Sequence, residues 1–145
     1  RHCRPERTES RQTMKTQEGR TPRMALGKAG EDAVCEFLSR NGHTILDRNY
    51  RAGHLEIDII SLDGNGVHFV EVKTRVAPTL TRPGEVVDAT KQNRIAKAAA
   101  RYLASRKSNP LSPGLEINFD VASVVFENGD IRIEWIPNAY YPMFF

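Results

Sequence analysis

The amino-acid sequence predicts an α/β fold in which a mixed central sheet of about five strands is flanked by helices. Two segments carry apolar residues at helical spacing, and five shorter segments have the apolar pattern of strands. Turns rich in Gly, Pro and Asn separate these segments. The expected order of elements is α-β-β-β-α-β-β, and 145 residues is the length of a single domain.

The first half of the chain is expected to form one helix and three strands. Apolar residues at helical spacing and the C-cap signal Asn41-Gly42 predict a helix over residues 25–40. The predicted strands are 43–50, 55–62 and 67–75. Because only the turn Asp63-Gly64-Asn65-Gly66 separates the last two strands, they should form an antiparallel hairpin.

The second half is expected to contain one helix and a second hairpin. A loop with two prolines at 77–84 precedes a helix over 88–106, for which Asp88 is a suitable N-cap. After a break at 109–114, strands at 116–126 and 130–136 should pair around the turn Asn128-Gly129.

Residues 1–24 lack hydrophobic periodicity and are expected to be a disordered basic tail, which leaves 25–145 as the domain. The tail contains seven Lys or Arg and three Glu, a net charge of +4, whereas the whole chain carries +3. The domain therefore has a net charge of −1, and the high isoelectric point is no argument that it binds nucleic acid. The tail is either a solvated segment or a basic arm that touches nucleic acid.

Composition argues against two other classes of protein. No apolar run approaches the roughly 20 residues of a membrane helix, and no apolar segment of a signal peptide is visible. Cys3 and Cys35 lie far apart, which argues against a disulfide framework. A cytoplasmic protein without membrane contact is expected.

Two predicted strands carry charges that need a partner. In residues 67–75, Phe69, Glu71 and Lys73 share one face, because side chains alternate along a strand. Counted from the hairpin turn, Asp58 on the preceding strand lies near the rung of Glu71. Adjacent carboxylates repel each other unless a cation lies between them, and ligation by oxygen alone favours Mg²⁺ or Mn²⁺. The alternative, a salt bridge between Glu71 and Lys73, would contribute little stability.

Other candidate residues surround this pair. Glu31 shares a helical stripe with buried positions and becomes a candidate metal ligand beside an acidic strand site, although alone it could be a capping residue. Lys91 and Arg94 belong to a basic helix stripe that is equally typical of phosphate contact and of a solvated face. Arg51 and Arg75 flank the site and are better phosphate candidates by position.

Three further features have ordinary structural interpretations. His43 and His68 lack the spacing of metal ligands and are interpreted as ordinary strand residues. Asp120 is either structural or a partner of the site. The aromatic C-terminus, 140–145, either packs on the domain or forms a dimer contact.

The ordered set of segments resembles the YraN family of bacterial proteins, within the restriction-endonuclease-like superfamily whose motif is written PD-(D/E)xK, and is similar to the archaeal Holliday-junction resolvases. The bare Asp…Glu-x-Lys motif is weak, but the ordered set is far more specific. Ile57 stands where the motif has Pro, and Leu55 where a Gly is expected; neither departure removes a catalytic group. The matching stretches, within about residues 25–140, are Gly27–Glu31, Asn49–Arg51, Glu56–Ile60, Phe69–Arg75, Lys91–Ile95 and Phe119–Val121.

The resemblance implies a restriction-endonuclease-like fold and a metal-dependent endonuclease. Asp58, Glu71 and Glu31 would hold Mg²⁺ or Mn²⁺, and Lys73 would position or activate the attacking water and stabilise charge at the phosphorus. Gln92 would be an auxiliary polar residue.

The expected substrate is DNA, with branched DNA as a candidate, and RNA remains open as a partner. The resemblance also implies a homodimer, because related resolvases cut two strands symmetrically. The alternative is a nucleic-acid-binding module that keeps the fold without turnover. A purely structural protein is the least favoured.

Overall fold

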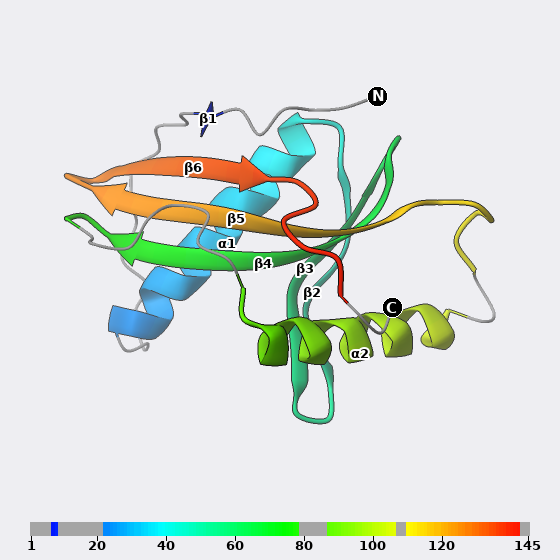
Figure 1. Cartoon of the computed structure of the whole chain (residues 1–145). Coiled ribbons are helices and arrows are strands. Elements are labelled where there is room, and N and C mark those ends of the chain that lie inside the picture. Colours follow the sequence, from blue (N-terminus) through cyan, green and yellow to red (C-terminus); the bar gives the residue numbers. More distant parts are fainter. Residues whose placement is uncertain (1–6, 9–21, 79–86, 107–109, 143–145) are drawn as a thin grey trace.

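A mixed sheet forms the centre of the computed structural model, with α1 on one face and α2 on the other (Figure 1). The structure describes residues 7–8, 22–78, 87–106 and 110–142. The strand order is β1-β6-β5-β4-β3-β2; β4 and β5 are parallel, and the other neighbours are antiparallel. The elements are β1 (Arg7–Thr8), α1 (Pro22–Arg40), β2 (Thr44–Ala52), β3 (Leu55–Asp63), β4 (Gly66–Val76), α2 (Ala89–Ser105), β5 (Ile117–Glu127) and β6 (Asp130–Ile136).

The predicted α/β class, element order and turns are confirmed. Asp88 caps α2, because its carboxylate accepts a hydrogen bond from the Lys91 backbone N–H at 2.9 Å. Asn128 and Gly129 both have positive φ, 51° and 81°, as the tight turn of the β5–β6 hairpin requires. Local turn and cap chemistry therefore fixes these boundaries.

The N-terminal side differs from the expected boundaries. α1 begins at Pro22 rather than at residue 25, and proline is favoured at a first helical position because its φ is preset. Arg7–Thr8 pair with β6 and add a two-residue sixth strand. Both pieces belong to the segment expected to be disordered. The rest of that segment, and the loop expected through residue 84 beyond Pro78, lie outside the described residues.

Two apolar layers hold the helices to the sheet. On the α1 side, Val34 and Leu38 pack with Val70 and Phe126. On the α2 side the packed residues include Phe69, Ile95, Tyr102, Phe119 and Tyr140. The rings of Phe119 and Tyr140 are 5.6 Å apart, so this part of the aromatic C-terminus packs on the domain. Neither α1 nor α2, the helices of the described chain, has the length and apolar composition needed to span a bilayer.

Side chains alternate between the two faces of the sheet along β4, as expected, but the faces expected for the side chains of β3 are wrong. Phe69 packs on the α2 side and Val70 on the α1 side, as expected. In β3, however, Ile57 packs on the α2 side and Ile59 on the α1 side, although they were expected to share a face. Before Ile59, β3 pairs with β2 but not with β4. The two-stranded β2–β3 ribbon extends past α2 (Figure 1), and such ribbons twist more than wide sheets.

A glycine sets how closely α1 approaches the sheet. A Cβ atom on Gly30 would lie 2.1 Å from Oγ1 of Thr74, a half-buried residue of β4. Only glycine permits this contact without displacing the helix. The close approach fixes the position of the next residue, Glu31, against the strands that carry Asp58 and Glu71.

Candidate carboxylate site between β3 and β4

Asp58 and Glu71 lie where β3 parts from β4. The last paired rung of the two strands is Ile59 with Val70, and Asp58 and Glu71 are the next residue on each strand. Beyond this rung, Oδ2 of Asp58 accepts a hydrogen bond from the Val72 backbone N–H at 2.8 Å. The side chain thus takes the acceptor role that a neighbouring strand would otherwise supply. The expected juxtaposition of the two acids follows from the hairpin register.

The carboxyl group of Asp58 lies among other acids. Burial raises the pKa of Asp58 to about 7, and the nearby charge of Glu71 adds to this rise. Glu31 and Glu56 act in the same direction, whereas the hydrogen bond from Val72 opposes it. A carboxyl group in such surroundings favours either a proton or a cation.

Glu31 reaches this group from the opposite element, α1. Glu31 and Asp58 line one pocket of about 220 Å³, whose other lining residues include Arg23, Val72 and Thr74. Burial raises the pKa of Glu31, while a hydrogen bond from Asn49 and the charge of Arg48 oppose the rise. Arg48 Nη2 lies 3.8 Å from Glu31 Oε1 and only 2.7 Å from Asp32 Oδ1. Glu31 therefore lies between the Arg48 guanidinium group and the carboxyl group of Asp58.

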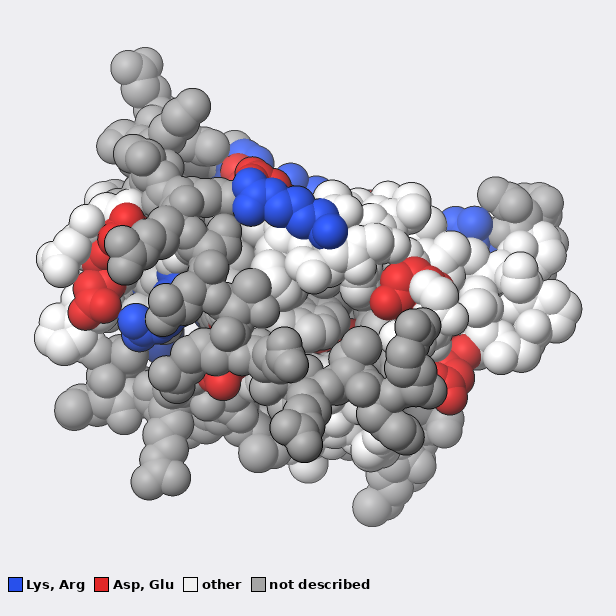
Figure 2. All heavy atoms as spheres, turned by 90° about the horizontal axis from the view of Figure 1, so that it is seen from above, with Lys and Arg blue, Asp and Glu red and all other residues white. Residues whose placement is uncertain are grey.

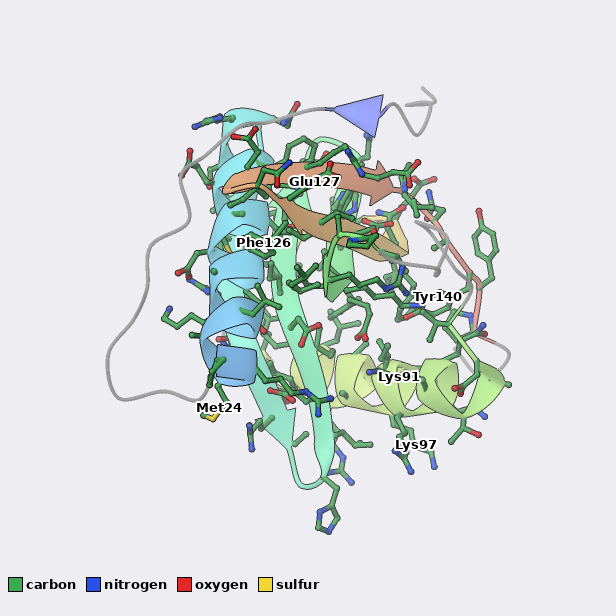
Figure 3. All side chains as sticks on the ribbon, turned by 90° about the vertical axis from the view of Figure 1, so that its left-hand side faces the viewer. Met24, Lys91, Lys97, Phe126, Glu127 and Tyr140 are labelled. Carbon is green, nitrogen blue, oxygen red and sulfur yellow. The ribbon has the colours of Figure 1, made fainter. Side chains whose placement is uncertain are left out.

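Glu71 has a cationic partner on α2. Lys91 Nζ lies 2.8 Å from Glu71 Oε2, and Glu71 is 9% exposed. Burial alone would lower the pKa of Lys91, but its hydrogen bond and ion pair with Glu71 raise it. In Figure 3, Lys91 lies on the side of α2 that faces the sheet and Lys97 on the opposite side.

This contact was missed from the sequence, although a signal existed. Lys91 precedes Ile95, Ala98 and Tyr102 at the spacing of the buried stripe of the helix.

The remaining predicted residues surround the acids at different depths. Lys73 is half-buried, and the regular pairing of β4 with β5 through Val76 keeps it on the face of Glu71. Arg75 is also half-buried. Arg51 is exposed and lies 3.6 Å from Glu56. The amide of Gln92 donates a hydrogen bond to the carbonyl of Val87 at 2.7 Å, and Arg94 is exposed.

The face of the molecule that lies uppermost in Figure 1 carries both signs of charge (Figure 2). On the face seen in Figure 2, visible Lys and Arg side chains are interspersed with Asp and Glu. Among the described residues on this face, no single basic patch marks a nucleic-acid surface.

The chemistry of the donor set suits a hard divalent cation, although Asp58, Glu71 and Glu31 do not all lie within 4.8 Å of one another. Asp58, Glu71 and Glu31 offer carboxylate oxygens, and the described residues that line the pocket include no His or Cys. Such oxygen donors suit Mg²⁺ or Mn²⁺ rather than softer ions. A cation would also relieve the repulsion that raises the pKa of Asp58.

The fold and site define an α/β protein whose mixed sheet opens at a cluster of carboxylates. The chain belongs to the uncharacterised protein family UPF0102, whose family model matches residues 30–124. It is 39% identical over 120 residues to a UPF0102 protein of Bacteroides thetaiotaomicron, covering 83% of this chain and 95% of that relative. It is 43% identical over 117 residues to a UPF0102 protein of Symbiobacterium thermophilum, covering 80% and 96%. The resemblance inferred from the motifs is confirmed at the level of this family.

The match to a solved structure is weak. That structure is Pyrococcus furiosus SfsA in complex with Ca²⁺, with a TM-score of 0.39 and 18% sequence identity. The alignment covers 79% of this chain and 64% of that chain, so this protein spans less than two thirds of SfsA.

Proposed function

We propose that the protein is a metal-dependent endonuclease that hydrolyses phosphodiester bonds of DNA. The observation that carries the proposal is the position of Asp58 and Glu71 just beyond the last rung that joins β3 to β4, with Glu31 lining the same pocket as Asp58. A cluster of partly buried acids is costly to the fold, and perturbed acids of this kind gather at functional sites. The Asp…Glu-x-Lys pattern and its similarity to the PD-(D/E)xK nucleases supply the reaction class.

In this proposal each site residue has a separate task. Asp58, Glu71 and Glu31 hold Mg²⁺ or Mn²⁺ through carboxylate oxygens. When bound, the cation supplies Lewis acidity and lowers the pKa of water. Lys73 orients the attacking water and places positive charge beside the phosphoryl oxygens as their negative charge develops. Lys91 compensates the charge of Glu71 before a cation binds.

Substrate contacts are proposed for the basic residues near the acids. Arg51 and Arg94 are exposed and can reach phosphates, and Arg75 lies further along the strand of Lys73. Lys91 and Gln92 complete the predicted set from α2. A preference for branched DNA and action as a homodimer follow from the similarity to the resolvases and belong to the same proposal.

One observation favours the alternative of a binding module without turnover. The ion pair between Lys91 and Glu71 satisfies the charge of Glu71 without any metal ion. A protein that keeps the fold and this pair could bind DNA and leave it uncut. The two functions differ in whether binding is followed by metal-dependent cleavage.

The test is cleavage of a four-way DNA junction and of a linear duplex by the full chain, with Mg²⁺, Mn²⁺ or EDTA. We expect metal-dependent cutting by the wild type and a rate loss of about 100-fold or more in Asp58→Asn and Lys73→Met. The matched control is Lys97→Met, which removes an exposed lysine from the far side of α2. This control should cut like the wild type.

Two results would overturn the proposal in different ways. Tight junction binding without cutting under every metal condition would establish the binding module. No calorimetric binding of Mn²⁺ at millimolar concentration would remove the metal site itself.

A further inference from the structure

A second cluster of metal-ligating side chains lies at the other end of the β3–β4 pairing. His43 precedes β2, Asp63 ends β3, and His68 lies on β4. One ligand atom from each lies within 4.8 Å of the others. His43 Nε2 is 3.3 Å from Asp63 Oδ2, and His68 Nε2 is 2.8 Å from Asp63 Oδ1. Both imidazoles thus turn the same nitrogen toward one carboxylate.

Tight turns bring these residues together. Gly42, two residues after the end of α1, has a φ of 86°, and the N–H of His43 donates to the carbonyl of Leu38 at 2.9 Å, as in a Schellman motif. At the hairpin turn, Oδ1 of Asp63 accepts a hydrogen bond from the Asn65 N–H at 2.9 Å. Hydrogen-bonded turns after α1 and at the end of β3 therefore hold the residues of the cluster in place.

The second nitrogen of each imidazole also has a partner. His43 Nδ1 lies 2.9 Å from Oγ of Ser61, a fully buried residue. His68 Nδ1 lies 2.5 Å from Oδ2 of Asp120, which is also fully buried. The other oxygen of Asp120 accepts a hydrogen bond from the Asn138 N–H at 2.7 Å. Partners of this kind orient the imidazole of a metal-bound histidine and fix its tautomer.

The chemistry of the cluster suits a transition metal. Two imidazoles and one carboxylate form a known ligand set of zinc and other first-row ions, with one position left for water. Zinc–ligand bonds of about 2.0–2.1 Å place neighbouring donors roughly 3.3 Å apart in a tetrahedral site. The distance from His43 to Asp63 already has this value, whereas the 2.8 Å contact of His68 with Asp63 is a hydrogen bond that would lengthen slightly when an ion binds. Asp63 is 15% exposed, which leaves a route from solvent.

We propose that His43, Asp63 and His68 form a binding site for a divalent first-row transition-metal ion. Asp120 and Ser61 are the residues that orient its two histidines. The site is separate from the carboxylate site and does not depend on the proposed nuclease function. Its imidazole ligands should make it prefer Co²⁺ or Zn²⁺ to Mg²⁺.

The chain contains an internal reporter for this test. Trp135 is its single tryptophan, and the ring lies 5.9 Å from that of His43 and 6.2 Å from that of His68. Co²⁺ bound to the cluster should quench Trp135 fluorescence and show the visible absorption of a histidine-ligated ion. We expect saturable quenching in the full chain, reversal by Zn²⁺, and no effect of Mg²⁺.

Variants assign the binding to this cluster. His43→Asn and His68→Asn should abolish the saturable quenching, and Asp120→Asn should weaken Co²⁺ binding by about 10- to 100-fold. His54→Asn is the matched control, since His54 is exposed in the turn after β2. Asp58→Asn separates the two sites and should also bind Co²⁺ normally. A His2→Asn, Cys3→Ser background removes the donors at the N-terminus.

Two results of these titrations would overturn the proposed transition-metal site. Absence of saturable quenching in the wild type would overturn the proposal, whatever the variants do. Quenching that persists in His68→Asn, in a protein whose circular dichroism shows that it is folded, would do the same.

Discussion

The carboxylate of Asp58 accepts a hydrogen bond from the Val72 backbone N–H at 2.8 Å, just beyond the last rung that joins β3 to β4. A polar side chain therefore replaces main-chain pairing where the sheet opens. This bond orients a carboxyl group that has Glu71 and Glu31 as acidic neighbours. The opening of the sheet and the acidic site are thus one structural feature.

The first prediction concerns how Asp58 affects stability at different pH values. Its pKa is about 7 in the fold and about 3.9 in an unfolded chain. A raised pKa means that the neutral form stabilises the fold; this contribution is complete below about pH 4 and is lost as the pH rises to 7. Asp58→Asn keeps an acceptor for Val72 and should be more stable than the wild type at pH 8 by roughly 2–4 kcal/mol.

Urea denaturation without divalent cations at pH 4 and pH 8 measures this difference. At pH 4 the two proteins should be nearly equal. Asp58→Ala is the control, because it also removes the acceptor of the Val72 N–H and should be about 1 kcal/mol less stable than Asp58→Asn at both pH values. A stability difference between wild type and Asp58→Asn that does not change with pH would contradict the raised pKa.

The second prediction concerns the ion pair of Lys91 with Glu71. A cation at the acids has to share Glu71 with the Lys91 ammonium group, 2.8 Å away. Lys91→Met should therefore increase Mn²⁺ affinity by roughly 3- to 10-fold. It should also lower the free energy of unfolding by about 1–2 kcal/mol when no metal is present, because Glu71 is buried without its partner.

Calorimetry with Mn²⁺, beside the same measurement on Lys97→Met, checks this competition. The exposed Lys97 should change neither quantity. If Mn²⁺ affinity fell in Lys91→Met, Lys91 would instead help to hold the site together.

Much of the fold could be predicted because local chemistry dictates it. Asp88 as a cap and Asn128-Gly129 as a turn need only their neighbours in the chain. The approach of Asp58 to Glu71 also follows from counting outward from one hairpin turn.

Features that depend on tertiary packing were not predictable in the same way. The change of face between Ile57 and Ile59 arises because β3 continues as a two-stranded ribbon. The contact between Lys91 and Glu71 depends on how α2 lies on the sheet. The cluster of His43, Asp63 and His68 forms only in the folded chain, where the end of α1 and the hairpin turn bring the three residues together. Their spacing in the sequence therefore does not reveal a metal site.

The third prediction concerns Tyr140, which is 6% exposed and packs on Phe119. Among the described residues its hydroxyl has no hydrogen-bond partner, and burial raises the pKa of Tyr140. Tyr140→Phe should therefore leave stability unchanged or increase it by up to about 1 kcal/mol. Tyr140→Ala should cost about 3 kcal/mol or more, because the ring is lost from the core. Thermal denaturation of both variants checks this; a clear loss of stability in Tyr140→Phe would show that the hydroxyl has a partner.

The fourth prediction compares two glycines of α1. A Cβ on Gly30 would lie 2.1 Å from Thr74 Oγ1, whereas a Cβ on Gly27 would have no neighbour within 4 Å. Gly30→Ala should lower the free energy of unfolding by about 1–3 kcal/mol through overpacking. Gly27→Ala should raise it by about 0.5–1 kcal/mol through helix propensity. Because Glu31 follows Gly30, only Gly30→Ala should also weaken Mn²⁺ binding.

A second substitution tests the cause of these losses. Thr74→Ala, added to Gly30→Ala, removes the hydroxyl that the new Cβ would meet, and it should recover part of the loss of stability and of Mn²⁺ binding. Denaturation and calorimetry on this set distinguish a contact that positions Glu31 from a general effect on the helix, and equal effects of the two glycine substitutions would contradict the close packing of α1 on β4.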